Sequence, residues 1–345
     1  MKPLPASVAL LAMILCLLGA ASTIAQSQEQ VGSDQTLKNL IDMGGGRHLN
    51  FICAGKGSPT VVFLQALGAA IPNWRKVQDP AAAITRTCLY DRAGFGYSDP
   101  SNLPSTADNM VDDLHTALHA AGITGRVVLV GHSLGGLVAT LYTDKYEPQV
   151  AGLVLVDPSF ADQFSFPLSQ QSKDAIHAGD NQFLALLQSC KMLAAEHKLS
   201  RTDSHNCFRF PQNPTPAEAQ YFEHQFTSPD YYATGISELE NFNPSGDWTS
   251  IDGAEEMRQK RSFGNIPLEV LTRSIFVHDS QMSDAENKAS EEYWKLGHDK
   301  LAARSTRGKS IVIPQSSHQI QGDQPQRVVE AIRKVVLEVR QADMH

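Results

Sequence analysis

The residue best placed to do chemistry in this chain is Ser133, in the pattern Gly-x-Ser-x-Gly at positions 131–135. Four apolar residues at 127–130 predict a buried strand before it, and 137–142 has helical composition. A serine on such a strand-to-helix turn presents its hydroxyl outward, and glycines spare the crowded turn the clash of a Cβ. Taken alone, the five-residue pattern favours a Gly/Ser loop. The flanking strand and helix favour a nucleophilic serine beside a helix N-terminus, which stabilises developing negative charge.

Serine is a weak nucleophile at neutral pH and needs a base within hydrogen-bond reach. His318 follows an apolar stretch at 310–314 and precedes a loop that leads to a helix at 325–341. A histidine with a pKa near 6.5 suits the role of base and then acid. The alternative is a histidine without a catalytic role, on the surface or hydrogen-bonded in the core. His132 is expected to pack beside the serine turn. The other histidines lack the spacing of metal ligands, so we expect no metal and no organic cofactor.

Strands and helices alternate along most of the chain, which predicts a mostly parallel sheet flanked by helices. The predicted strands are 49–53, 60–65, 86–90, 126–130, 151–156, 268–272 and 310–314, and the predicted helices are 106–121, 133–146 and 325–341. Residues 158–265 break this alternation and hold ten of the fourteen Phe. We expect an insertion there, after the strand at 151–156.

Four segments of the chain resemble the α/β-hydrolase family, in the family's order, within about residues 45–340. They are the strand and loop at 60–68, the loop at 90–98, the serine turn at 127–136 and the last strand with its histidine at 311–318. The resemblance implies an α/β-hydrolase fold whose core comprises 26–157 and 266–345, with 158–265 as a cap over the serine. It implies His318 as the catalytic base.

Two aspartates compete for the third position of a catalytic triad. The family usually carries this acid in the loop after the strand at 268–272, where Asp279 and Asp284 lie rather far from the strand end. Other members place it after the preceding strand, where Asp157 stands at the tip of 151–156, the end at which α/β sheets hold their active sites. We favour Asp157, with Asp279 second. Capping of the turn before Pro158 is the structural alternative for Asp157.

The resemblance also implies an oxyanion hole made of the backbone N–H groups of Leu67 and Leu134. Family members often have His-Gly where this chain has Gln65-Ala66, so this loop departs from the family's pattern. Asp91 and Arg92 resemble a pair that holds the fold near the loop.

Of the five cysteines, Cys16 falls in the N-terminal segment, and Cys53, Cys88, Cys190 and Cys207 remain. An even number in an exported protein suggests two disulfides, which allow three pairings, and four buried free thiols are the alternative. In the α/β-hydrolase sheet the second and fourth strands are neighbours. The resemblance therefore implies Cys53–Cys88, with Cys190–Cys207 inside the insertion.

The N-terminus has Lys2, an apolar run from Val8 to Leu18 and then small residues. This pattern predicts a signal peptide at 1–25, since the run is short for a bilayer span; an N-terminal anchor is the alternative. We expect a secreted or periplasmic protein with no stable membrane span after cleavage. The net charge of −8, without a basic block, argues against nucleic-acid binding.

These features together predict a serine hydrolase that cleaves an ester or related acyl bond of a small molecule through an acyl-serine intermediate. An amidase or peptidase and a carbon–carbon bond hydrolase use the same triad, and a non-catalytic binding protein could keep the same fold. The substrate, its chain length, the cap residues that line the pocket and the oligomeric state do not follow from the sequence.

Overall fold

The structure, a computed structural model, describes residues 37–344, and the predicted signal peptide at 1–25 lies outside the described residues. The strands are β1 (Leu40–Asp42), β2 (His48–Ala54), β3 (Thr60–Leu64), β4 (Thr87–Tyr90), β5 (Val127–His132), β6 (Val150–Val156), β7 (Leu268–Arg273) and β8 (Gly308–Ile313). The helices are η1 (Ile71–Trp74), α2 (Arg75–Ala82), α3 (Ala107–Ala120), α4 (Leu134–Tyr146), η2 (Glu147–Gln149), α5 (Gln170–Ala195), α6 (Pro216–Thr227), α7 (Pro229–Phe242), α8 (Ile251–Gln259), α9 (Asp284–Ala302), α10 (Ile320–Asp323) and α11 (Pro325–Ala342).

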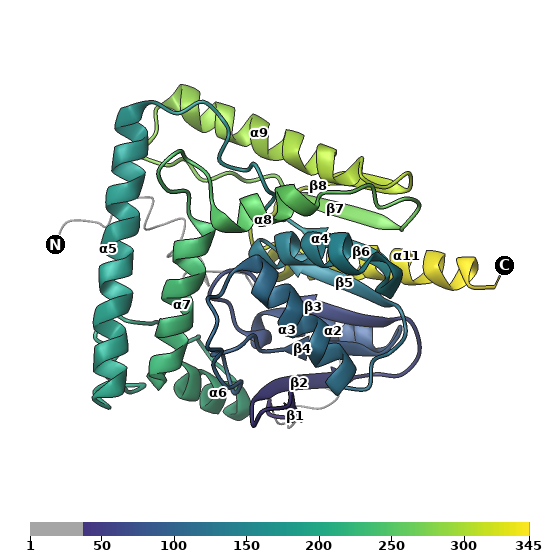
Figure 1. Cartoon of the computed structure of the whole chain (residues 1–345), viewed down its shortest axis with the longest axis horizontal. Helices are drawn as coiled ribbons and strands as arrows, with labels where there is room; N and C mark the ends of the chain where they lie inside the picture. Colours follow the sequence, from purple (N-terminus) through teal and green to yellow (C-terminus); the bar gives the residue numbers. More distant parts are fainter. Residues whose placement is uncertain (1–36, 345) are drawn as a thin grey trace.

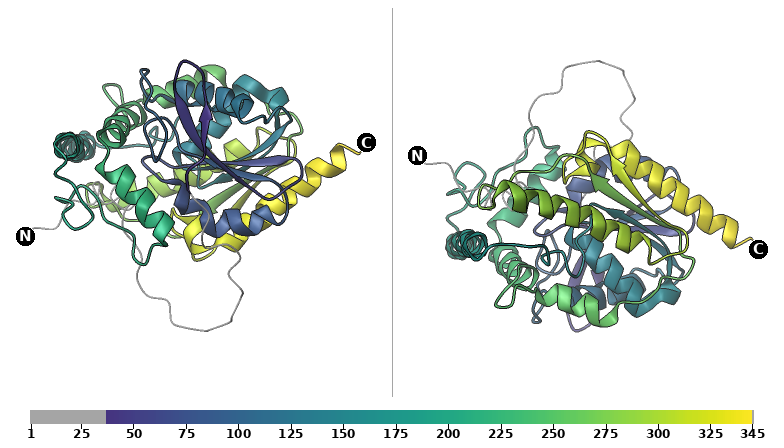
Figure 2. Two further views of the ribbon diagram at one scale, coloured as in Figure 1. Left: turned by 90° about the horizontal axis from the view of Figure 1, so that it is seen from below. Right: turned by 90° about the horizontal axis from the view of Figure 1, so that it is seen from above.

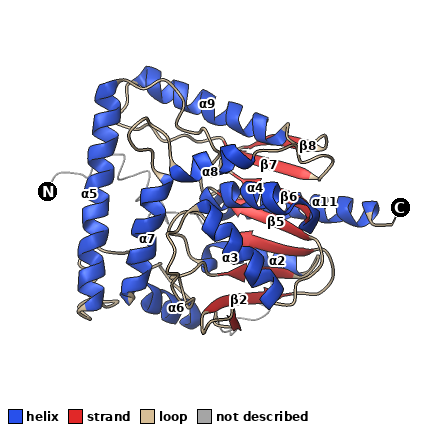
Figure 3. Cartoon of the chain, in the orientation of Figure 1, coloured by secondary structure: helices blue, strands red, loops and turns tan. Residues whose placement is uncertain are grey.

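The eight strands form one sheet in the order β1-β2-β4-β3-β5-β6-β7-β8. Strands β3 to β8 pair in parallel, whereas the pairs β1–β2 and β2–β4 are antiparallel. Helical crossovers between parallel strands cover both faces of such a sheet. Figure 3 shows the strands as one twisted sheet among helices.

Alternation along each central strand divides the core into two layers. Phe63 and Val130 belong to the apolar cluster on the face covered by α2 and α11, whereas Leu64 and Leu129 belong to the cluster on the face covered by α3 and α4. The views of Figure 2, from below and from above, show these helix pairs on opposite sides of the sheet. The seven predicted strands and three predicted helices are all present, with ends shifted by a few residues.

Residues 158–265 hold four helices, α5 to α8, that the sequence analysis does not place. Helices α5 and α7 pack side by side and stand at the end of the sheet where the parallel strands terminate (Figure 1). A short segment at 243–250 follows α7 and leads into α8. Helix α8 then packs on α3 and α4, so the chain returns to the core before β7 begins.

Helix α9 is a further element that the sequence analysis does not place. It begins with a capping box, in which the side chains of Ser283 and Glu286 each bond to the other residue's backbone N–H. Such reciprocal bonds satisfy the free donors of a first helical turn. Helix α9 packs on β7 and β8. It therefore covers the part of the sheet that follows β6.

Two disulfide bonds are present, Cys53–Cys88 and Cys190–Cys207. Cys53 and Cys88 are direct partners in the register of β2 and β4, with their Cα atoms 4.1 Å apart. The second bond ties the end of α5 to the segment before α6, with Cα atoms 5.5 Å apart. Both pairings are those that the family resemblance implies.

The helices were also compared with the requirements of a membrane span. Among residues 37–344, no helix combines the length and apolarity needed to cross a bilayer.

Candidate active site

Ser133 occupies the sharp turn between β5 and α4, with φ 52° and ψ −122°. A non-glycine residue rarely adopts such a backbone, which persists only where its surroundings enforce it. A Cβ on Gly135 would collide with the carbonyl oxygen of Leu64, and one on Gly131 would collide with that of Gly135. The glycines are therefore required by close backbone packing, as the pattern predicts. Ser133 is 6% exposed.

Asp157 also has a positive φ, 43°, directly after β6. Its backbone N–H donates to the carbonyl oxygen of Leu271 in β7, at 2.7 Å. The carbonyl of Ser133 accepts the N–H of Ser159, at 3.0 Å. The serine turn and the aspartate are thus fixed to one another through the ends of adjacent strands.

His318 lies in the loop after β8, and its Nδ1 is 2.5 Å from Asp157 Oδ2. The side chain of Asp157 is fully buried, while that of His318 is 29% exposed. Among residues 37–344, no hydrogen bond joins Ser133 to the His318 ring. The loop is instead held by the neighbour of Ser133, since His132 Nε2 lies 2.8 Å from the backbone oxygen of His318.

Three further hydrogen bonds surround the Asp157 carboxylate. Trp294 Nε1 in α9 donates to Oδ1 at 2.9 Å, the backbone N–H of Arg273 donates to the same oxygen at 3.1 Å, and Arg273 Nη1 donates to Oδ2 at 2.6 Å. Sequence reasoning missed Trp294 and Arg273. The capping box before α9 is the sequence signal that could have placed Trp294 on a helix over this strand end.

These contacts decide the charge of Asp157. Burial alone raises the pKa of its carboxyl, but the positive charge of Arg273 and the hydrogen bond from His318 outweigh burial and hold the pKa well below its usual range. Opposite charges and hydrogen bonds to the ionised form act in this direction. Asp157 is therefore a carboxylate at neutral pH.

Two other histidines lie near His318 and are buried. Burial, together with the charge on His318, lowers the pKa of His132 to about 3, and burial lowers the pKa of His298 to about 4. His298 Nδ1 lies 2.6 Å from the hydroxyl of Thr272 and its Nε2 lies 2.9 Å from the carbonyl oxygen of Pro158. Both rings are neutral and engaged in structural contacts at neutral pH, which agrees with the expectation that His132 packs beside the turn.

Asp279, the second candidate for the triad acid, makes no hydrogen bond to His318 within residues 37–344. Its Oδ1 accepts the N–H of Gln281, and its backbone bonds to the side chain of Asn287 in α9. These contacts make Asp279 part of the turn that leads into α9. Asp284, at the start of α9, has its Oδ1 2.9 Å from His278 Nε2.

The loop after β3 carries Leu67, and the helix after the serine begins with Leu134. Neither backbone N–H has a hydrogen-bond acceptor within residues 37–344. Gln65 stands where this loop departs from the family's pattern. Its side chain is buried, with the residue 2% exposed, and its amide group has no hydrogen-bond partner in the described part of the chain.

The guanidinium of Arg92 fixes the backbone of this loop. Its Nη1 donates to the carbonyl oxygen of Gln65 at 2.8 Å and its Nη2 to that of Ala66 at 2.9 Å. Asp91 instead accepts hydrogen bonds from Asn50 and from Tyr221 of α6. The geometry gives both residues a role in holding the fold, which is the role the sequence analysis expects.

The residues that follow β5, β6 and β8 determine which chemistry this site can perform. Within the described residues, no group of three His, Cys, Asp or Glu side chains could hold a metal ion. The groups present are a hydroxyl, an imidazole, a carboxylate and free backbone N–H groups.

The sequence matches the family described as "alpha/beta hydrolase fold" over residues 59–332. This range includes β3 to β8 and, with them, Ser133, Asp157 and His318. The chain belongs to the α/β-hydrolase fold family. The match confirms the predicted fold class and supports the prediction of a hydrolase.

Two curated relatives of this α/β-hydrolase match it over about a third of the chain. The uncharacterized protein YqjL of Bacillus subtilis is 30% identical over 123 residues, 36% of this chain and 49% of YqjL. The human (lyso)-N-acylphosphatidylethanolamine lipase is 32% identical over 122 residues, 34% of each chain. The chain thus spans about half, or less, of the length of these relatives.

A solved structure matches over most of the chain. A thermophilic esterase from Thermogutta terrifontis superposes with a TM-score of 0.53 and 20% identity, covering 88% of this chain and 98% of the esterase. At this identity the likeness concerns the fold alone.

Proposed function

We propose that this α/β-hydrolase cleaves an ester or related acyl bond, with Ser133 as nucleophile, His318 as general base and acid, and Asp157 as the triad acid. The observation that carries the proposal is the 2.5 Å contact between Asp157 Oδ2 and His318 Nδ1 beside the strained Ser133 turn. The three residues follow the order Ser, Asp, His along the chain, which is the order of this family.

In the first half-reaction, Ser133 Oγ attacks the acyl carbon while its proton passes to His318 Nε2. The bond between the acyl carbon and the leaving oxygen then breaks, and the proton on Nε2 passes to that oxygen. His318 Nδ1–H donates to Asp157 throughout, which fixes the tautomer with Nε2 free and stabilises the imidazolium. Catalytic hydrogen bonds often tighten only with substrate bound, so we expect the Ser133–His318 contact to form there.

In the second half-reaction, His318 Nε2 takes a proton from water, and the water oxygen attacks the acyl carbon of the ester on Ser133. The acyl–Oγ bond breaks, and the proton returns to Ser133. The products are a carboxylic acid and the free enzyme. Both tetrahedral intermediates carry a negative oxygen, for which the free N–H groups of Leu67 and Leu134 are the proposed donors.

An ester or related acyl substrate is supported by the kinds of protein that this chain resembles, a lipase in sequence and an esterase in fold. We extend the proposal to residues 158–265 as a cap over the site, because α5 and α7 stand at the strand ends (Figure 1). Secretion or export to the periplasm is proposed from the N-terminal pattern, and the two disulfides are consistent with it.

The test is hydrolysis of nitrophenyl esters of graded chain length by the purified protein and by Ser133→Ala. We expect turnover with a preference for one range of chain lengths, and a loss on the order of 10⁴-fold or more in the variant. Equal turnover by both proteins would contradict the proposal.

A further inference from the structure

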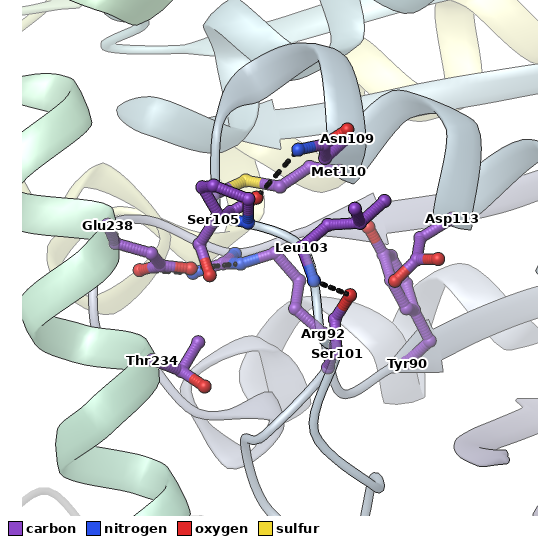
Figure 4. Close-up of a pocket in the computed structure, with 12 residues that line it drawn as sticks. Tyr90, Arg92, Ser101, Leu103, Ser105, Asn109, Met110, Asp113, Thr234 and Glu238 are labelled. Atoms are coloured by element: carbon purple, nitrogen blue, oxygen red, sulfur yellow. Dashed lines mark hydrogen bonds and ion pairs between the residues drawn. The ribbon is translucent and has the colours of Figure 1, made fainter.

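A buried ion pair joins α7 to the loop that carries Leu67. Glu238 of α7 has no exposed side-chain surface, and the side chain of Arg92 is 6% exposed. Arg92 Nε lies 2.7 Å from Glu238 Oε1, and Arg92 Nη2 lies 3.1 Å from Glu238 Oε2. Figure 4 shows the two side chains pointing toward each other from the α7 ribbon and from the segment after β4. Both residues line a small pocket.

Both partners also bond the loop itself. Arg92 donates to the carbonyl oxygens of Gln65 and Ala66, and Glu238 Oε2 accepts the backbone N–H of Gly68 at 3.0 Å. The pair therefore holds the residues on both sides of Leu67 and leaves the Leu67 N–H without an acceptor in residues 37–344.

We propose that Glu238 is a positioning residue that connects α7 to the oxyanion hole, so that seating of α7 on the core sets the direction of the Leu67 N–H. The inference rests on the proposed function for its catalytic consequence. Its structural part, that Glu238 fixes the loop at 65–68, stands independently.

A carboxylate suits this task because it accepts several hydrogen bonds and neutralises a buried guanidinium. Removing its charge leaves Arg92 buried without its closest counter-charge, a situation that rearranges or destabilises a structure. A misplacement of about 1 Å at a site of reaction can cost on the order of 10²-fold in rate. The expected defect is therefore in turnover more than in substrate binding.

The chain offers a matched control in Glu256 of α8. Its Oε1 lies 2.6 Å from Arg304 Nη1, and its side chain is 2% exposed. This pair also joins residues 158–265 to the core, but in the described part of the chain neither partner bonds to the loop at 65–68. Arg304 also retains a second acidic partner in Asp144.

The experiment compares Glu238→Gln with Glu256→Gln by steady-state hydrolysis of the best nitrophenyl ester and by inhibition with a trifluoromethyl ketone, whose adduct with a serine carries an oxyanion. We expect Glu238→Gln to lower kcat by roughly 10- to 100-fold. It should change KM by less than about threefold and weaken the inhibitor by the same factor as kcat. Glu256→Gln should leave each of these quantities nearly unchanged. Equal effects of the two variants, or an unchanged kcat in Glu238→Gln, would overturn the proposal.

Amide hydrogen exchange separates this proposal from the proposed function. Faster exchange in peptides covering 64–70 in Glu238→Gln, but not in Glu256→Gln, is expected even if the wild-type protein proves inactive on every ester. Unchanged exchange there would overturn the positioning role. If Glu238→Gln does not fold, Arg92→Lys, which keeps the charge but loses the planar fork, takes its place with the same expected results.

Discussion

His318 Nδ1 lies 2.5 Å from Asp157 Oδ2, although the two residues are 161 positions apart in the sequence. Asp279, the other candidate for the acid, bonds instead to the turn before α9. The geometry therefore favours Asp157, because the end of β6 faces the histidine loop.

Replacement of each aspartate by asparagine tests this choice. Asp157→Asn should lower ester turnover near neutral pH on the order of 10³- to 10⁴-fold, because the amide cannot stabilise the imidazolium or hold the right tautomer. Asp279→Asn should retain turnover within a few fold. A near-normal Asp157→Asn with an inactive Asp279→Asn would show that the acid lies after β7.

Trp294 should support the acid through its hydrogen bond to Asp157 Oδ1. A hydrogen bond to a charged group contributes about 1.5–3 kcal/mol, so Trp294→Phe should lower kcat roughly 10-fold or more. The control is the adjacent Tyr293→Phe, which removes a hydrogen bond to Asp162 instead. Kinetics of both variants on the same ester check this, and equal losses would contradict a specific role for Trp294.

Much of the candidate site follows from local sequence because its residues stand at the ends of recognisable elements. The apolar run before Ser133 predicts a buried strand, and the tight turn requires the glycines that the pattern shows. Asp157 directly follows a second apolar run, so the order of strands in a parallel sheet is enough to bring it near the serine.

Two of the residues that sequence reasoning missed, Trp294 and Glu238, act through contacts distant along the chain. Trp294 reaches Asp157 across 137 positions and Glu238 reaches Arg92 across 146. Neither stands at a strand end or within a motif, and each depends on how a helix packs on the core. The helices of 158–265 were not predicted for a different reason, because this segment departs from the alternation of strands and helices on which the prediction of the core rests.

Asp252 of α8 should make stability depend on pH. Its Oδ1 accepts the N–H of Ala107 at the start of α3, and burial raises the pKa of its carboxyl from 3.8 to about 7. The folded state therefore binds the proton more tightly than the unfolded chain. The stabilisation from this proton is complete below pH about 4 and is lost as the pH rises through about 7.

Asp252→Asn keeps the acceptor oxygen and cannot ionise. We expect the Tm of the variant to fall less than that of the wild type between pH 5 and pH 8, measured by thermal unfolding. The exposed Asp79 gives the control, since Asp79→Asn should follow the wild type. If the Tm of the wild type and the Tm of Asp252→Asn change with pH in parallel, the claim that the buried Asp252 carboxyl titrates in this range is contradicted.

The disulfides make a direct prediction for exported protein. Peptide mapping without reduction should recover Cys53 joined to Cys88 and Cys190 joined to Cys207, as in the structure. Replacing Cys190 and Cys207 together by serine should lower the free energy of unfolding by about 2–4 kcal/mol, measured by denaturant unfolding. Recovery of four alkylated thiols would contradict both bonds.

The central claim is that Ser133 Oγ is the atom that becomes acylated, and covalent labelling tests it most directly. A fluorophosphonate reacts with an activated serine by forming a phosphorus–oxygen bond and releasing fluoride. Mass spectrometry of the labelled, digested protein should find one modified site, at Ser133, and Ser133→Ala should take up no label. Labelling at another residue, or equal labelling of Ser133→Ala, would contradict the account.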